Sequence, residues 1–183
     1  MIIKETNLEG CFVIDPVLFE DNRGLFFESF NRKVFFNETG SNIDFVQNNI
    51  SVSKRAVIRG LHMQKGDYAQ AKLVQVLKGR VLDVVVDVRL DSSTYGQTFS
   101  CELSEENKKQ LFIPRGFLHG FSSLEEGSIL SYKCDNYYHK ASEIGVRFDD
   151  ETLKIDWQIN PSEVELSEKD KQLISFEELK SHL

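Results

Sequence analysis

The sequence contains few cysteines, and no two of them lie close together. Cys11, Cys101 and Cys134 are the only three in 183 residues, and no CxxC motif occurs. An odd number of widely spaced cysteines does not suit a disulfide framework. We therefore expect three reduced, packed thiols and a cytoplasmic protein.

Long apolar runs and basic clusters are also missing. The most apolar stretch, VLDVVVDVRL at 81–90, is too short and too charged to cross a bilayer. Lys4, Glu5 and Glu9 interrupt the N-terminal segment too early for a signal peptide. The formal net charge is -7 and no block of Lys and Arg stands out, which excludes an ordinary nucleic-acid groove. We expect neither a membrane nor a nucleic-acid partner.

The sequence further lacks repeats, low-complexity segments and linkers rich in Pro or Gly, so we expect residues 1–183 to form a single domain. Hydrophobic residues make up 40% of the chain, which is enough for a real core. Short β-prone runs alternate with turn signals such as DNRG (21–24) and KGR (78–80). This alternation is typical of a β sandwich or barrel.

Two segments have helical patterns. The segment NRKVFFNETG predicts one short helix, with Asn31 as its N-cap and Gly40 after its end. The final segment, 166–183, is amphipathic, so we expect a helix that packs outside the barrel.

The alternation of side chains along two strands predicts a polar interior. In 81–88, one face carries only aliphatic residues, whereas the other carries Asp83 and Asp87 among valines. In FVQNNISVS (45–53), four polar residues point the same way: Gln47, Asn49, Ser51 and Ser53. Such a face lies either in solvent or in a barrel lumen that hydrogen-bonds a ligand.

Two ionisable residues, His62 and Lys72, stand at the entrances of consecutive apolar runs. A cupin-type metal site has two His and a Glu here, followed by a G-x5-P-x-G-x2-H pattern. The second half is present in IPRGFLHGF (113–121), but Gln64 replaces the second His and Lys72 lies near the position of the Glu. Because an ammonium has no lone pair to offer a cation, we expect no metal site.

The plain alternative for His62 is a buried histidine that a backbone carbonyl satisfies. Lys72 is harder to explain in this way, because a buried ammonium at the start of LVQVL is costly unless an anion meets it. Proton abstraction next to a carbonyl requires a base, and a cation beside the developing oxyanion. We therefore favour an acid/base site that contains both residues.

Six segments together resemble the dTDP-4-dehydrorhamnose 3,5-epimerase family. They follow the family's order and cover most of the chain: DNRGLFFESF (21–30), VQNNISVSKRAVIRGLHMQ (46–64), QAKLVQVLKGRVLDVVVDVR (70–89), IPRGFLHGF (113–121), SYKCDNYY (131–138) and LSEKD (166–170). The resemblance implies a mainly β fold, a cupin-type double-stranded β-helix (jelly roll) with a few short peripheral helices.

The resemblance also implies a chemistry. In a 4-keto sugar the carbonyl acidifies the hydrogens on C3 and C5, and an epimerase removes a proton from one face and returns one to the other. By resemblance, His62 is the base and is paired with Asp170. Tyr132 matches the proton donor on the opposite face, and Lys72 stabilises the enolate oxygen. This chemistry requires no metal and no redox cofactor.

Plain alternatives remain for two of these residues. Asp170 also suits the first turn of a helix that Ser167 caps, and this role is compatible with the first one. Tyr132 alone is equally consistent with a core tyrosine whose hydroxyl has a backbone partner. Tyr137 and Tyr138 are rival proton donors nearby.

Further positions match the family's substrate-binding residues. They are Arg23, Phe26, Glu28, Gln47, Asn48, Asn49, Arg59, His119, Tyr138, Glu143 and Lys169. Arg23 and Arg59 suit a diphosphate, because a guanidinium binds phosphate oxygens in pairs. Phe26 and Tyr138 are candidates for stacking on the base. Family members are homodimers that pair N-terminal strands across subunits, which implies that a partner lends residues to the pocket.

The resemblance therefore predicts an enzyme that acts on a nucleotide sugar. It implies epimerisation of dTDP-4-dehydro-6-deoxy-D-glucose at C3 and C5, giving dTDP-4-dehydro-L-rhamnose for surface polysaccharide. A single-centre epimerase or ketoisomerase and a non-catalytic sugar-binding cupin are the alternatives. A metal-dependent cupin dioxygenase is disfavoured by Gln64 and Lys72.

Overall fold

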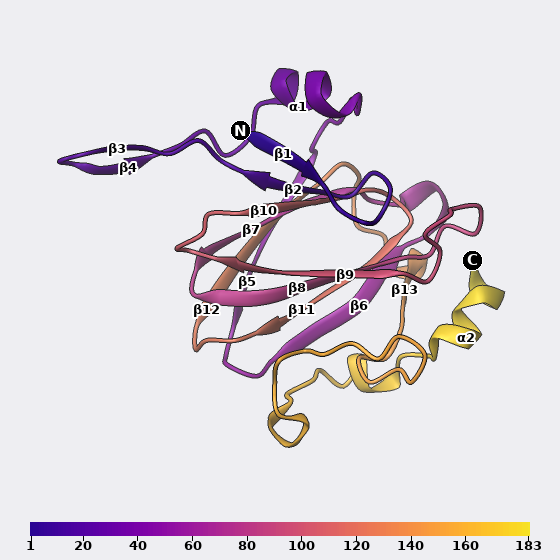
Figure 1. The fold of residues 1–183 in the computed structure, drawn as a ribbon. Coiled ribbons are helices and arrows are strands. Elements are labelled where there is room, and N and C mark those ends of the chain that lie inside the picture. The colour runs from indigo at the N-terminus through magenta and orange to yellow at the C-terminus, as the bar shows by residue number, and fades with distance from the viewer.

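The computed structural model describes residues 1–183 and consists mainly of two antiparallel sheets that face each other (Figure 1). In spatial order, the strands of the larger sheet are β1 (Ile2–Glu5), β2 (Phe12–Asp15), β10 (Gln110–Ile113), β7 (Lys72–Lys78), β12 (Ser128–Cys134) and β5 (Gln47–Ser53). Those of the smaller sheet are β13 (Glu143–Gly145), β6 (Ile58–Gln64), β11 (Phe117–Ser123), β8 (Arg80–Asp87) and β9 (Thr98–Ser104). This arrangement confirms the predicted jelly roll.

A separate hairpin of β3 (Phe19–Asp21) and β4 (Gly24–Phe26) projects away from both sheets (Figure 1). The helices are short, as predicted. They are α1 (Arg32–Thr39) and α2 (Phe176–Leu179), with 3-10 turns η1 (Gly66–Tyr68), η2 (Lys140–Ser142), η3 (Pro161–Glu163), η4 (Asp170–Gln172) and η5 (Lys180–His182). None of them has the length and apolar character needed to span a membrane.

Three apolar clusters hold these layers together. The first lies between the sheets and includes Val85 of β8 and Leu130 of β12. The second covers the outer face of the smaller sheet, where Val84 packs with residues of the C-terminal segment. The third lies beneath α1, around the fully buried Phe35. β8 is therefore buried on both faces, and its aliphatic residues and its aspartates divide between the faces as the alternation predicts.

The helix predicted in 31–40 is confirmed with both of its ends. Asn31 caps α1, because its side-chain oxygen accepts a hydrogen bond of 3.1 Å from the backbone N–H of Val34. Gly40 ends the helix with a φ of 72°, a left-handed conformation that glycine adopts without strain. The three cysteines are free thiols, as expected.

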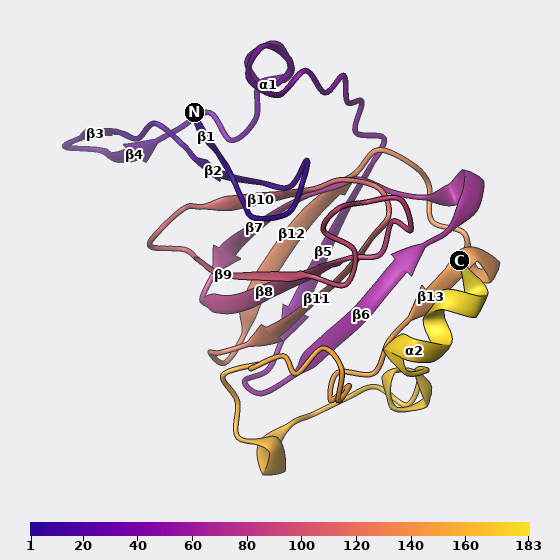
Figure 2. The same cartoon turned by 45° about the vertical axis from the view of Figure 1, so that its right-hand side comes forward.

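The continuous helix predicted in 166–183 is wrong. Two short turns and α2 replace it, and Ile174 between them is extended, because it forms a parallel bridge with Val146. Ser175 then starts α2 through a capping box with Glu178. The segment does pack outside the sheets, as predicted: Figure 2 shows it beside β6 and β13, with Leu179 fully buried.

Candidate active site

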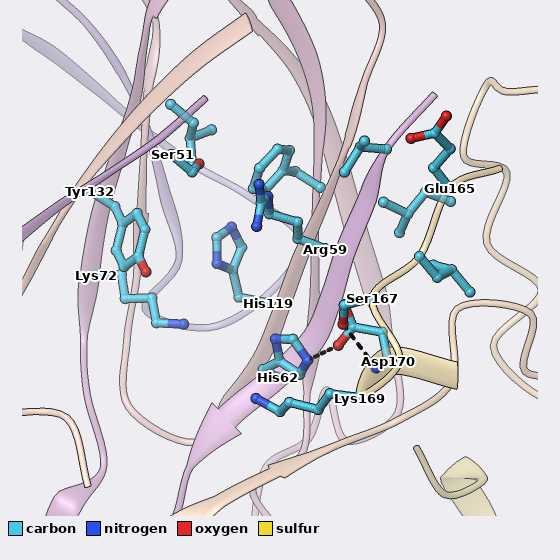
Figure 3. A pocket seen from close by; sticks show the side chains of 15 residues that line it. Ser51, Arg59, His62, Lys72, His119, Tyr132, Glu165, Ser167, Lys169 and Asp170 are labelled. Atoms are coloured by element: carbon cyan, nitrogen blue, oxygen red, sulfur yellow. Dashed lines mark hydrogen bonds and ion pairs between the residues drawn. The ribbon is translucent and has the colours of Figure 1, made fainter. Parts of the chain in front are cut away.

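A cavity opens between the two sheets, where the core does not fill the space. Its larger lobe has a volume of about 500 Å³ and is bounded by strands of both sheets and by residues 165–170 (Figure 3). A smaller lobe of about 270 Å³ adjoins it. His62, Lys72 and Tyr132 line both lobes, so they stand at the junction between them. The volume is in the range of small-ligand sites.

Two glycines determine where His62 lies. β6 and β11 approach closely at Gly60 and Gly120, and a Cβ atom built on Gly60 would lie 2.5 Å from the Cα of Gly120. Gly60 also has a φ of 117°, which side-chain-bearing residues rarely adopt. Two residues later, His62 pairs in register with His119. The close approach therefore places both histidines against the cavity.

His62 and Asp170 form a dyad. The Nε2 of His62 lies 2.6 Å from Oδ1 of Asp170, whose side chain is only 5% exposed. Burial by itself raises the pKa of the Asp170 carboxyl, but the hydrogen bond and charge of His62 outweigh it and hold this pKa below its usual value. An ionised carboxylate only accepts hydrogen bonds, so Nε2 is the donor and Nδ1 keeps its lone pair.

The short turn η4 fixes the carboxylate of the dyad. The backbone N–H of Asp170 donates a hydrogen bond of 3.1 Å to the Ser167 hydroxyl. Asp170 lies in the first turn of η4, as predicted, but the N-cap of this turn is Lys169, and Ser167 contacts the turn through this backbone hydrogen bond.

Tyr132 and Lys72 approach the same space from neighbouring strands of the larger sheet. Lys72 Nζ lies 5.9 Å from the centroid of the Tyr132 ring, and Figure 3 shows the ammonium and the phenol directed into the cavity with His62. Burial raises the pKa of the Tyr132 hydroxyl and lowers the pKa of the Lys72 ammonium. The rival donor Tyr137 is 64% exposed and lines neither lobe.

A second histidine–carboxylate pair forms part of the cavity wall. His119 Nε2 lies 3.0 Å from both carboxylate oxygens of Asp83, which is fully buried. Burial lowers the pKa of His119, and Asp83 opposes this effect only in part. The alternation along β8 indicated that Asp83 faces inward, but the sequence did not identify its partner.

Arg59 enters the larger lobe from β6 (Figure 3). Its Nε donates a hydrogen bond of 3.1 Å to the Ser53 hydroxyl, and one Nη donates to the Val52 carbonyl at 3.3 Å. Both acceptors belong to β5, so the guanidinium is held across the end of the larger lobe. This is the place for an anionic part of a ligand.

Amide side chains line the smaller lobe. Gln47 Nε2 donates to Asn49 Oδ1 at 3.0 Å, and the Tyr138 backbone N–H donates to Gln47 Oε1 at 3.1 Å. Gln64 and Gln70 also line this lobe, although sequence reasoning did not name them as site residues. The position of Gln64 on the same strand face as His62 was the available signal.

Glu143 of β13 lines the smaller lobe and contacts Lys169, which lines the larger one. Its Oε1 lies 2.5 Å from Lys169 Nζ, and the Tyr138 hydroxyl donates to its Oε2 at 2.8 Å. His62 Nδ1 lies 4.0 Å from Oε1. Burial by itself raises the pKa of the Glu143 carboxyl, but the hydrogen bonds from Lys169 and Tyr138 lower it below its usual value.

Three predicted substrate-binding residues lie outside the cavity of their own chain. Arg23 is at the turn of the β3–β4 hairpin and pairs with Asp21, with Nη2 2.6 Å from Oδ2. Phe26 of the same hairpin is 69% exposed. Glu28 accepts a hydrogen bond of 3.1 Å from the Asn31 amide, beside α1.

Asn48 also lies outside the cavity. Successive residues of a strand point to opposite faces, and Gln47 and Asn49 take the inner face. The Asn48 side chain is directed outward, where Oδ1 accepts a hydrogen bond of 3.4 Å from Ser131. The other predicted substrate-binding residues line the two lobes: Gln47, Asn49, Arg59, His119, Tyr138, Glu143 and Lys169.

Known proteins with similar sequences all point to one family. The family described as dTDP-4-dehydrorhamnose 3,5-epimerase matches residues 5–178. The Escherichia coli (strain K12) protein of that description is 44% identical over 179 residues, which cover 98% of this chain and 96% of the relative.

Solved structures agree. The dTDP-4-dehydrorhamnose 3,5-epimerase of Elizabethkingia anophelis NUHP1 superposes with a TM-score of 0.95 at 52% identity, covering 97% of each chain. The dTDP-6-deoxy-D-glucose-3,5-epimerase of Legionella pneumophila Philadelphia 1, solved in complex with dTDP-4-keto-L-rhamnose, gives 0.94 at 41% identity, covering 99% of this chain and 95% of that one. Full-length similarity at this level leaves one assignment: the chain belongs to the dTDP-4-dehydrorhamnose 3,5-epimerase family.

Proposed function

We propose that this protein is an isomerase that inverts C3 and C5 of dTDP-4-dehydro-6-deoxy-D-glucose and so forms dTDP-4-dehydro-L-rhamnose. The product would serve dTDP-L-rhamnose and surface polysaccharide synthesis. Membership of the family supports this activity. The observation that carries it is the shared cavity, in which the imidazole of His62, the phenol of Tyr132 and the ammonium of Lys72 meet.

The first step is the abstraction of a proton next to the C4 carbonyl. His62 Nδ1 has a free lone pair, because the ring proton is on Nε2, which donates a hydrogen bond of 2.6 Å to Asp170. The C–H electron pair moves into the enolate while Nδ1 takes the proton, and the ionised Asp170 stabilises the imidazolium that results. Asp170 therefore has an orienting and an electrostatic role.

The second step returns a proton to the other face of the same carbon. The ammonium of Lys72 faces the cavity, where it stabilises the negative enolate oxygen. Because burial raises the pKa of Tyr132, the phenol holds its proton until the enolate carbon takes it. These side chains supply the proton transfers and the charge stabilisation without a metal or a redox cofactor.

The remaining polar residues suit the nucleotide part of the substrate. Arg59 and Lys169 are cations of the larger lobe and fit the oxygens of a diphosphate. The amides of Gln47 and Asn49 and the ring of Tyr138 lie in the smaller lobe, where they fit hydrogen-bonding and stacking groups.

We further propose that the chain acts as a cytoplasmic homodimer of one domain per subunit. Arg23, Phe26 and Glu28 match substrate-binding positions but lie outside their own cavity, on or beside a projecting hairpin. A partner subunit brings such a hairpin to a neighbouring cavity. In that arrangement Arg23 adds a second guanidinium for the diphosphate.

Solvent exchange tests this function. The purified protein is incubated with dTDP-4-dehydro-6-deoxy-D-glucose in deuterium oxide, and the sugar is analysed by NMR and mass spectrometry. We expect deuterium at both C3 and C5, with inversion at each carbon, because both carbons flank the same carbonyl. Label at one carbon alone would identify a single-centre epimerase. No label at all would identify a sugar-binding protein without catalysis.

A further inference from the structure

The proposed function raises a problem of proton balance, which this inference addresses and on which it rests. One base and one donor serve two carbon centres. After the first inversion His62 holds an additional proton and Tyr132 has lost one. Before the second inversion, His62 must lose its proton and Tyr132 must regain one. The cavity therefore needs a proton path between His62 and solvent.

The Nε2 side of His62 offers no such path. The Asp170 carboxylate on that side is 5% exposed and is held by the dyad and by its turn. Its lowered pKa also makes it a poor proton acceptor. The proton taken from the sugar lies on the other nitrogen, Nδ1.

The Nδ1 side faces a second carboxylate. Glu143 Oε1 lies 4.0 Å from Nδ1, and the Glu143 side chain is 14% exposed. Its two hydrogen-bond partners lie at the mouth of the cavity: the Lys169 side chain is 53% exposed, and Tyr138 is 51% exposed. A row of polar groups thus leads from the base to the solvent, with one gap of 4.0 Å between Nδ1 and Glu143 Oε1.

Substrate binding would change the hydrogen bonds among these polar groups. In the free protein, Lys169 and Tyr138 occupy both oxygens of the Glu143 carboxylate. Both partners are among the groups that we propose for nucleotide binding, so the nucleotide competes with Glu143 for them. Once they turn to the nucleotide, the hydrogen bonds that lower the pKa of Glu143 are lost while its burial remains. The carboxylate then becomes a better proton acceptor.

We propose that Glu143 carries the proton from His62 Nδ1 to solvent between the two inversions, and that nucleotide binding frees it to do so. The imidazolium N–H bond breaks as a carboxyl O–H bond forms, and water at the mouth then takes this proton. Water in the smaller lobe returns a proton to the Tyr132 phenolate. Protons balance over each inversion, and no oxidant or reductant takes part.

The distance is compatible with this role. A separation of 4.0 Å is too long for a hydrogen bond, but hydrogen bonds in a site without substrate often tighten when the substrate binds. Release of Lys169 allows the carboxylate to turn toward the imidazole, and a water molecule can bridge the remaining gap.

The test uses Glu143→Gln in deuterium oxide. Glutamine keeps the size of the side chain and accepts a hydrogen bond from Lys169, but it cannot carry a proton. We expect the second inversion to slow far more than the first when rapid quench and NMR measure the two rates separately, because an effect on substrate binding appears in both rates. The second inversion slows by about 100-fold, the scale of one lost proton-transfer group. A singly inverted dTDP-sugar with one deuterium therefore accumulates.

Glu168→Gln is the matched control. Glu168 lies beside Lys169, and its side chain is 84% exposed and paired with Lys171. We expect its substitution to leave the product ratio unchanged. Equal slowing of both inversions by Glu143→Gln would indicate a structural role and overturn the proposal, as would an unchanged product ratio. If the wild-type protein labels fewer than two carbons, the proposed function fails instead.

Discussion

At the scale of the residue, the surroundings of Tyr132 and His62 suit these two side chains to opposite proton-transfer roles. Burial raises the pKa of the Tyr132 hydroxyl, so this group is protonated at neutral pH, as the proposed donor must be. On the other side, Asp170 occupies Nε2 of His62 and leaves Nδ1 as a proton acceptor. The direction of each proton transfer follows from these two environments.

Tyr132→Phe should separate the two proton transfers. The variant retains the base, so in deuterium oxide we expect label to enter the substrate without inversion, because His62 returns deuterium to the face it has deprotonated. Inversion falls by about 100-fold or more, since the donor on the opposite face is absent. NMR of the recovered sugar measures label and configuration together.

His62→Ala provides the comparison, with neither label nor inversion expected. Equal loss of label and inversion in Tyr132→Phe would assign the donor role to another group. Exchange retained in His62→Ala would remove this histidine from the mechanism.

Sequence motifs identified the chemical groups of the site but not their contacts. His62 and Lys72 were singled out first by their positions in apolar runs, and Tyr132 and Asp170 were found by resemblance. All four line the larger lobe. The bond between His62 and Asp170 joins residues 108 positions apart, which no local pattern encodes. Asp83 was placed on the inner face by alternation, yet its partnership with His119 depends on the pairing of β8 with β11.

At the scale of the element, the position of His62 depends on the close approach of β6 and β11. Gly60 lies against Gly120 of β11, in a backbone conformation with positive φ. A larger residue at either position must push the two strands apart. Because His62 follows Gly60 by two residues, such a displacement moves the base relative to Tyr132 on the opposite sheet.

Gly60→Ala should therefore lower stability and activity together. We expect a loss of about 1–3 kcal/mol in the free energy of unfolding, measured in urea, from steric overlap alone. Gly24→Ala is the control, because Gly24 has a similar φ of 127° but no atom within 4 Å of an added Cβ. The difference between the two losses of unfolding free energy measures the steric contact between the strands. Equal losses in both variants would show that the backbone conformation alone causes the destabilisation.

The two helical predictions differ in outcome for a physical reason. The helix in 31–40 is defined by its own capping residues, Asn31 and Gly40, which a sequence displays directly. The segment 166–183 is also amphipathic, but the bridge between Ile174 and Val146 holds it extended in the middle. Distant pairing overrides local propensity there.

At the scale of the whole molecule, the exposure of the projecting hairpin motivates the proposal that two subunits complete each site. Phe19 and Phe26 are 60% and 69% exposed on this hairpin, an unusual position for large aromatic residues. Arg23 between them has only Asp21 as a partner. In the proposed homodimer, a partner's cavity would give all three residues an environment that their own chain does not provide.

Mixed dimers test this arrangement. A chain with Arg23→Ala is co-expressed with a chain with His62→Ala, and the heterodimer is purified through two different tags. If Arg23 acts on the partner's cavity, one of the two sites contains both native residues, and we expect about half of the wild-type activity.

The reciprocal heterodimer pairs a wild-type chain with a chain that carries both substitutions. Sharing across subunits predicts that it is nearly inactive, because neither site is then intact. The reverse result, with activity only in this second heterodimer, would place Arg23 in the cavity of its own chain.

The long separation of His62 and Asp170 along the chain has a consequence for protein synthesis. The ribosome synthesises His62 well before Asp170, the acid that orients it, since 108 residues separate them. A chain that ends before Asp170 lacks the carboxylate that orients His62, so its base remains unoriented. We expect fragments that end before this turn to lack the proposed activity even where they fold.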